Sequence, residues 1–170
     1  MNADPNSDPN PSPVANPNPR IFLIVVDDSA EMRVALSYAA RRAAHTGGRV
    51  ALLYVIEPSD MQQWMAVETL MREEQRTQAE LLLAKLSAEI IEIAGAQPVV
   101  YIREGRRRDE LLALIDEEPG ISILVLAAGT GQEGPGPLIT ALIGKMSGRL
   151  RVPITIVPGD LSDEQIAAVA

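Results

Sequence analysis

"IFLIVVDDSAEM", residues 21–32, is the stretch of this chain that decides the fold class. Its first six residues are an uninterrupted apolar and largely β-branched run, which is typical of a strand buried on both faces, as in a parallel sheet. Asp28 and Glu31 then have the spacing of a capping box, so we expect a helix to begin directly after Asp28. The stretch therefore predicts a buried strand that turns at once into a helix, the first half of a β-α-β unit.

The alternation of strands and helices continues to residue 158. Four further strands are predicted at residues 49–56, 98–103, 121–127 and 153–157. Helices are predicted from Asp28 to the Gly47-Gly48 stop and at residues 60–94, 108–118 and 137–150, and a short one is possible within the last nine residues. Strands that alternate with helices predict an α/β fold with a parallel sheet covered on both faces.

The long helical segment, residues 60–94, has an unusual middle. Its residues 72–80, "REEQRTQAE", are polar on every side, so we expect a break or an exposed, mobile section there. Apolar residues on either side of this section predict two separate packing patches.

Composition excludes several classes of function. The net charge of −8 argues against a nucleic-acid binder, and the absence of cysteine excludes disulfides and thiolate metal sites. No apolar run approaches the roughly 20 residues that span a bilayer, so no membrane association is expected. Residues 1–19 are rich in proline and asparagine and predict a disordered tail ahead of a domain at 20–158, with residues 159–170 as a C-terminal tail. The first residues do not resemble a secretory signal, so we expect a cytoplasmic protein.

The first strand and its acidic pair resemble the start of a response-regulator receiver domain. Adjacent carboxylates such as Asp27 and Asp28 would suit a magnesium ion there. A receiver also needs an aspartate that ends its third strand and a lysine that ends its fifth. In this chain no predicted strand after the first ends in aspartate, and the two lysines, Lys85 and Lys145, do not end the fifth strand. The receiver remains a minor alternative.

A resemblance to the universal stress protein family covers residues 20–158. That family typically has Asp-Gly-Ser after its first strand, where this chain has Asp27-Asp28-Ser29. Its second strand often reads like "LLYVIEP", residues 52–58 here, and a later G-x-x-x-E-L-L segment corresponds to Gly105 and the residues "RRRDELL" that follow it. A glycine loop, a helix, a proline and a last strand complete the resemblance.

The resemblance implies a Rossmann-like fold of the adenine-nucleotide hydrolase type, with strand order 3-2-1-4-5. It also implies a homodimer that pairs through the last strand, Ile154–Val157. Some members of the family bind ATP and others do not. In those that do, the residue that matches Asp27 contacts the nucleoside, the backbone near Val55 faces the adenine, and the phosphates lie on a G-x2-G-x9-G-[ST] loop.

The candidate loop lies within "AAGTGQEGPGPLITALIGKMSGRL", residues 127–150, and two registers are possible. Gly131, Gly134 and Gly144 fit the glycine spacing, but Lys145 then replaces the serine or threonine. A register without insertions places Ala127, Thr130, Thr140 and Ala141 at the motif positions, and we favour it. A backbone nest from the glycines and a hydroxyl from Thr140 would still suit an anion. The candidate ligand-contact residues are therefore Asp27, Val55, Gly129, Gly131, Gly134 and Thr140.

The leading hypothesis is a binding and regulatory module of the stress response that binds an adenine nucleotide weakly, in an altered way or not at all. The alternative is an ATP binder with slow ATP hydrolysis. We interpret Arg106, Arg107 and Arg108 as a solvated helix start, away from the expected cleft. No protein partner other than a second copy is identified.

Overall fold

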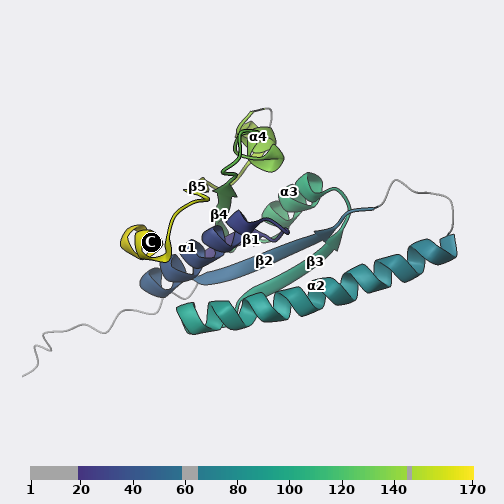
Figure 1. The fold of residues 1–170 in the computed structure, drawn as a ribbon, viewed down its shortest axis with the longest axis horizontal. Helices are drawn as coiled ribbons and strands as arrows, with labels where there is room; N and C mark the ends of the chain where they lie inside the picture. The colour runs from purple at the N-terminus through teal and green to yellow at the C-terminus, as the bar shows by residue number, and fades with distance from the viewer. Residues whose placement is uncertain (1–18, 59–64, 145–146) are drawn as a thin grey trace, which may run out of the picture.

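The computed structural model of the chain describes residues 19–58, 65–144 and 147–170. Within these ranges five strands form one parallel sheet: β1 (Ile21–Val25), β2 (Arg49–Ile56), β3 (Val99–Glu104), β4 (Ile121–Ala128) and β5 (Ile154–Pro158). The helices are α1 (Ala30–Thr46), α2 (Met65–Ala94), α3 (Arg107–Glu117), α4 (Pro137–Ile143) and α5 (Asp163–Val169), with a 3₁₀ turn, η1, at Ser147–Arg149. Figure 1 shows the sheet with helices on both of its faces.

The strand order is β3-β2-β1-β4-β5, with all neighbours parallel. This order confirms the order that the family resemblance implies. It excludes the receiver alternative, because doubly wound receiver-type sheets have the order 2-1-3-4-5. The order also sets the position of the candidate site, since the chain departs from β1 toward β2 and β3 and later returns to build β4 and β5 on its other side.

Two apolar layers hold the sheet, and each contains alternate residues of β1. Phe22 and Ile24 face α1 and α2, whereas Leu23 and Val25 face α3 and α4. The inward stripe of α1 consists of six buried residues: Met32, Ala35, Leu36, Ala39, Ala40 and Ala43. Both faces of β1 are covered, so every side chain of the strand meets an apolar layer. This explains its uninterrupted apolar run, as the sequence predicted.

The predicted break in the long helix is wrong, because α2 is continuous from Met65 to Ala94. The polar residues of this section are exposed, as expected, whereas Ala79 within it is buried. Arg76 lies 3.6 Å from Glu80 on the same helix and 3.6 Å from Glu104 at the end of β3, and these ion pairs connect the section to its neighbours. Helix formers without packing partners thus continue the helix. The predicted start at Asp60 lies outside the described residues.

The helix after the glycine loop is shorter than predicted. It begins at Pro137 as expected, but α4 ends at Ile143, and Gly144 follows as its C-cap. Ile139 and Leu142 are buried and pack in the apolar layer of the sheet. Within the described ranges, no helix has the length and apolar character that crossing a bilayer requires.

Candidate functional site

The carboxyl ends of β1 and β4 lie side by side at the point where the chain changes direction across the sheet. In open α/β sheets ligands bind in the crevice beyond this point. A pocket of about 170 Å³ lies there, and its lining includes Asp27, Ser29, Glu31, Arg107, Gly129 and residues 135–139. Two of the six predicted contact residues, Asp27 and Gly129, therefore lie in one pocket.

Asp27 is oriented by the first turn of α1. Its Oδ1 accepts hydrogen bonds from the backbone N–H of Ser29 at 2.9 Å and from the Ser29 hydroxyl at 2.5 Å. The Ser29 Oγ in turn accepts from the backbone N–H of Met32 at 3.2 Å, so Ser29 is the N-cap of α1. The predicted capping box of Asp28 and Glu31 is therefore wrong. Asp27, Ser29 and the helix N-terminus instead form one short chain of hydrogen bonds beside the pocket.

Glu31 is free of the cap because it binds the loop that follows β4. Its Oε1 accepts from the Thr130 N–H at 3.2 Å and from the Thr130 hydroxyl at 2.9 Å. A hydrogen bond from its own backbone N–H, followed by the two from Thr130, lowers the pKa of the Glu31 carboxyl below its usual range. A carboxylate that stays ionised thus lies against the loop on which the family resemblance places phosphates.

The glycine loop closes on itself. The Gly129 N–H donates to the Pro135 carbonyl at 3.2 Å, and Gly134 and Gly136 have φ values of 88° and 106°, which side chains rarely adopt. The Thr140 hydroxyl donates to the Gly136 carbonyl at 2.9 Å, one turn back along α4. The Gly129 N–H and the Thr140 hydroxyl, two donors that a phosphate would use, therefore already have partners within the loop and α4.

The other predicted loop residues lie on the outer side of the loop. Gly131, Gly134 and Thr140 line a wide hollow of about 950 Å³, together with Gly129. Gly129 also lines the inner pocket, so the loop separates the two spaces. Val55 lines neither, because its side chain is buried at 5% exposure in the apolar layer on the α3 face. The structure thus divides the predicted set between two sides of one loop, with Val55 apart.

Arg107 is the site residue that the sequence interpretation missed. Its backbone N–H donates to Glu57 Oε1 at 3.1 Å, and its guanidinium lies 3.3 Å from Glu57 Oε2. The same side chain lines the pocket of Asp27, so it is not part of a purely solvated helix start. The crossover from β3 to β4 must pass the carboxyl ends of β2 and β1, where the pocket lies. This topology was the signal that could have identified Arg107, at the start of α3, as a pocket residue.

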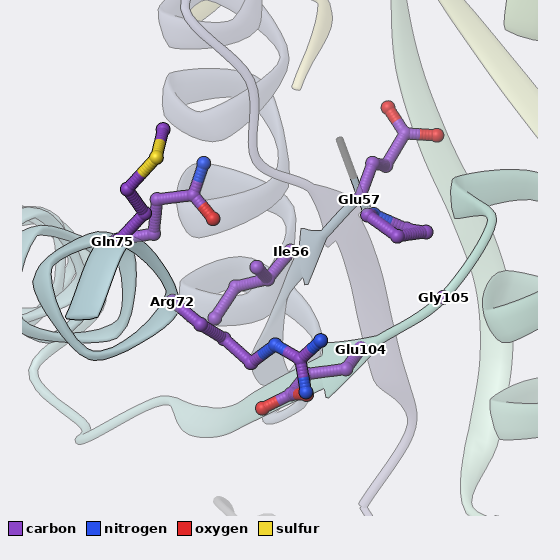
Figure 2. Close-up of a pocket in the computed structure, with 8 residues that line it drawn as sticks. Ile56, Glu57, Arg72, Gln75, Glu104 and Gly105 are labelled. Carbon is purple, nitrogen blue, oxygen red and sulfur yellow. The ribbon is translucent and has the colours of Figure 1, made fainter. Parts of the chain in front are cut away.

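A third space lies at the carboxyl ends of β2 and β3, against α2. It has a volume of about 220 Å³, and Glu57, Arg72, Gln75 and Glu104 contribute its polar lining. Figure 2 shows Glu57 on one side and Arg72 with Glu104 on another, and Arg72 lies 3.8 Å from Glu104. Glu57 therefore lies between the two spaces, because it lines this hollow and binds Arg107 of the other. Within the described ranges no group of three or more His, Asp or Glu residues is placed to hold a metal ion.

Comparisons with known proteins agree with this geometry. The profile of the Universal stress protein family matches residues 19–158. A search of curated protein sequences found no significant match.

Solved structures of the family have the same fold. The universal stress protein UspA from Lactobacillus plantarum superposes with a TM-score of 0.70 at 15% identity, over 84% of this chain and 99% of that one. A family member from Burkholderia pseudomallei superposes with a TM-score of 0.63 at 19% identity, over 84% of this chain and 98% of that one. A universal stress protein from Archaeoglobus fulgidus, solved in complex with dAMP, superposes with a TM-score of 0.52 at 19% identity, over 82% of this chain and 97% of that one. Because the family profile covers most of the chain, the chain belongs to the universal stress protein family.

Proposed function

We propose that the chain is a cytoplasmic binding and regulatory module of the stress response, whose cleft between β1 and β4 binds adenine nucleotides weakly or in an altered way. The observation that carries the proposal is the Glu31–Thr130 contact. It places a carboxylate on the loop where a nucleotide phosphate would lie, so any phosphate must displace it or be repelled by it.

The size of the cleft supports the same proposal. Pockets that enclose small ligands usually measure about 300–1,000 Å³, whereas the pocket beside Asp27 measures about 170 Å³. The segment from Pro135 to Ile139 forms one wall of it. A nucleoside would need this segment to move, and the hydrogen bond from Gly129 to Pro135 opposes that movement.

An adenine nucleotide is nevertheless the compound to test first. The Archaeoglobus fulgidus relative was solved with dAMP, and its 19% identity supports a common fold rather than a common ligand. In this chain the half-buried Asp27 carboxylate would accept from a ribose hydroxyl, and Arg107 would face the anionic part of the ligand.

The test is to denature the purified chain, to chromatograph what is released, and to titrate ATP and AMP with magnesium by calorimetry. We expect no released nucleotide and only weak binding. Glu31→Gln removes the competing charge and should strengthen ATP binding, whereas the exposed control Glu92→Gln should not. Tight ATP binding that is lost in Asp27→Ala would contradict the proposal, and phosphate release from ATP would favour the slow-hydrolysis alternative.

We also propose that the chain forms a homodimer through β5, Ile154–Val157. This strand is one edge of the sheet, and an edge strand leaves backbone donors and acceptors unpaired. Ile156 is 39% exposed there, which is unusual for an isoleucine in a strand. Ile156→Glu places like charges near each other across such an interface, so it should lower the mass measured by light scattering. An unchanged mass would contradict the β5 interface.

A further inference from the structure

The outward face of α2 has a stripe of residues that the protein's own core does not use. Leu70, Leu81 and Ile91 are 70%, 69% and 42% exposed, which are high values for such large apolar side chains. With four other exposed residues they recur at alternating spacings of four and three. The full stripe is Leu70, Glu74, Thr77, Leu81, Ala84, Ala88 and Ile91. Such a spacing places every member along one seam of a helix, as in helices that pair with another helix.

The inner face of α2 has a separate stripe. Ala79, Leu83, Leu86 and Ile90 are buried and pack against α1 and the sheet. The seam residues Thr77, Leu81, Ala84 and Ala88 each stand two positions before a member of this stripe, so the two faces lie about 160° apart around the helix. A helix that is apolar on two faces is usually covered on both. In the described part of the chain only the inner face of α2 has such a cover.

The two ends of the outer seam have complementary shapes. At the C-terminal end Ala84, Ala88 and Ile91 line a groove of about 410 Å³ together with Val100 and Ile102 of the edge strand β3. Small residues on the helix make this groove. At the N-terminal end Leu70 is 70% exposed and projects from α2. The N-terminal part of α2 extends past the carboxyl ends of β2 and β3 (Figure 1). If the α2 helices of two copies run in opposite directions, the projecting leucine of each copy can enter the groove of the other.

Glu74 of the seam and Lys85, which flanks the seam, have the same symmetry. Glu74 and Lys85 stand three helical turns apart on nearly the same side of α2, and both are exposed. Within the described ranges neither forms an ion pair. If two copies lie antiparallel about a two-fold axis near residue 80, each Glu74 meets the Lys85 of the other copy. In the same arrangement Leu70 of each copy reaches the groove of the other.

We propose that the outer face of α2 and the edge of β3 form a second self-interface, an antiparallel α2–α2 pair between two copies of this chain. It is isologous, because each copy contributes the same projecting leucine, groove, glutamate and lysine. It lies at the opposite edge of the sheet from β5, so it is independent of the dimer proposed above.

The mass of the assembly in solution tests the interface. Leu81→Glu puts a charge at the centre of the seam at an exposed helical position, so the fold should be unaffected. We expect this variant to have a lower mass than the wild type, whereas Val169→Glu, the same kind of change at a 59% exposed position on α5, keeps the wild-type mass. Ile156→Glu should keep the α2 pair, and the variant with both Leu81→Glu and Ile156→Glu should be a monomer. An unchanged mass for Leu81→Glu overturns the proposal, and so does a monomeric Ile156→Glu variant.

Cross-linking tests the orientation, because the chain has no cysteine of its own. Leu81→Cys should form a disulfide-linked dimer on oxidation. Glu74→Cys alone should not, since two such residues would lie roughly 16 Å apart in the antiparallel pair. A mixture of Glu74→Cys and Lys85→Cys chains should cross-link. A Glu74→Cys chain that links to itself would indicate parallel pairing and overturn the proposal.

A charge exchange tests the proposed pairs. Glu74→Lys alone should weaken self-association about tenfold, because two attractive contacts become repulsive. Adding Lys85→Glu should restore it. A double variant that associates no better than Glu74→Lys contradicts the assigned contacts.

Discussion

Glu31 in the first turn of α1 and Thr130 in the loop after β4 are joined by two hydrogen bonds. They connect the first helix to the last ligand loop across the topological switch point of the sheet. The contact fixes the loop and supplies a negative charge to it at the same time. It therefore stabilises the fold and disfavours an anion at the same position.

The Glu31 contact predicts a pH dependence of stability. Because the pKa of Glu31 is lowered in the folded state, the carboxylate contributes stability above its ordinary pKa of 4.5. That contribution is lost as the pH falls through the lowered pKa. Glu31→Gln should therefore show a shallower loss of stability below pH 4.5 in urea unfolding, and Glu92→Gln should follow the wild type.

A second carboxyl contributes to the same window. The hydrogen bond from Arg103 lowers the pKa of Glu117, so its contribution has the same sign. The Glu31→Gln variant should therefore retain part of the acid sensitivity of the wild type. The variant with both Glu31→Gln and Glu117→Gln should retain less of it. Equal acid sensitivity of the wild type and Glu31→Gln would contradict the assigned role of Glu31.

Gly159 is predicted to be intolerant of a side chain. A Cβ there would overlap the Ala128 carbonyl oxygen and the Glu31 Cγ, and the first of these is backbone that cannot move aside. Gly159→Ala should lower the free energy of unfolding by about 1–3 kcal/mol. Gly131→Ala is the matched control, because nothing lies within 4 Å of its position. Thermal unfolding of both variants measures the difference, and equal melting temperatures would refute the close approach.

Two adjacent isoleucines distinguish the faces of α2. Ile90 is fully buried and Ile91 is 42% exposed. Ile90→Ala should cost about 2–5 kcal/mol of stability, because it leaves a cavity. Ile91→Ala should cost less than about 1 kcal/mol when the chain is dilute enough to be monomeric. Urea unfolding of the two variants checks this, and a larger loss for Ile91 would reverse the assignment of the faces.

The N-cap of α1 can be assigned in the same way. Ser29→Ala removes the acceptor for the Met32 N–H and should cost about 1 kcal/mol. Asp28→Ala should have little effect, because Asp28 is exposed and Ser29 supplies the cap. Denaturant midpoints of the two variants compare them directly, and a larger loss for Asp28→Ala would restore the capping box that the sequence suggested.

The apolar patterns of the sequence predicted the strands, because burial on both sides of β1 leaves few other arrangements. They also predicted a packing patch before the polar section of α2, where Leu70 and Met71 are instead exposed. Local sequence patterns predicted less well those features that depend on contacts between residues far apart in the sequence. Asp28 and Ser29 are equally good caps by type, and the structure shows that Ser29 accepts from the Met32 N–H while Glu31 binds the distant Thr130. The polar section of α2 suggested a break because it has no apolar face, and its ion-pair partner Glu104 is too distant in the sequence to be foreseen.

The candidate site was predicted in part for the same reason. Asp27 and Gly129 follow strands whose ends must meet, so topology places them in one pocket. The path of a loop is not set by glycine spacing alone, and the hydrogen bond between Gly129 and Pro135 turns the remaining glycines outward. Arg107 was missed because three consecutive arginines give no sign of which one turns inward.

The pairing of β1 with β4 has a consequence for how the chain is made. Ile21 lies beside Ile121, so the central strand must wait for most of the chain to emerge from the ribosome before its second neighbour exists. Until then one edge of β1 can pair with another nascent chain. Parallel pairings between distant segments also form slowly. The candidate cleft is therefore among the last parts of the fold to form, and any chain that ends before β4 has an apolar strand β1 with one unpaired edge and no cleft at all.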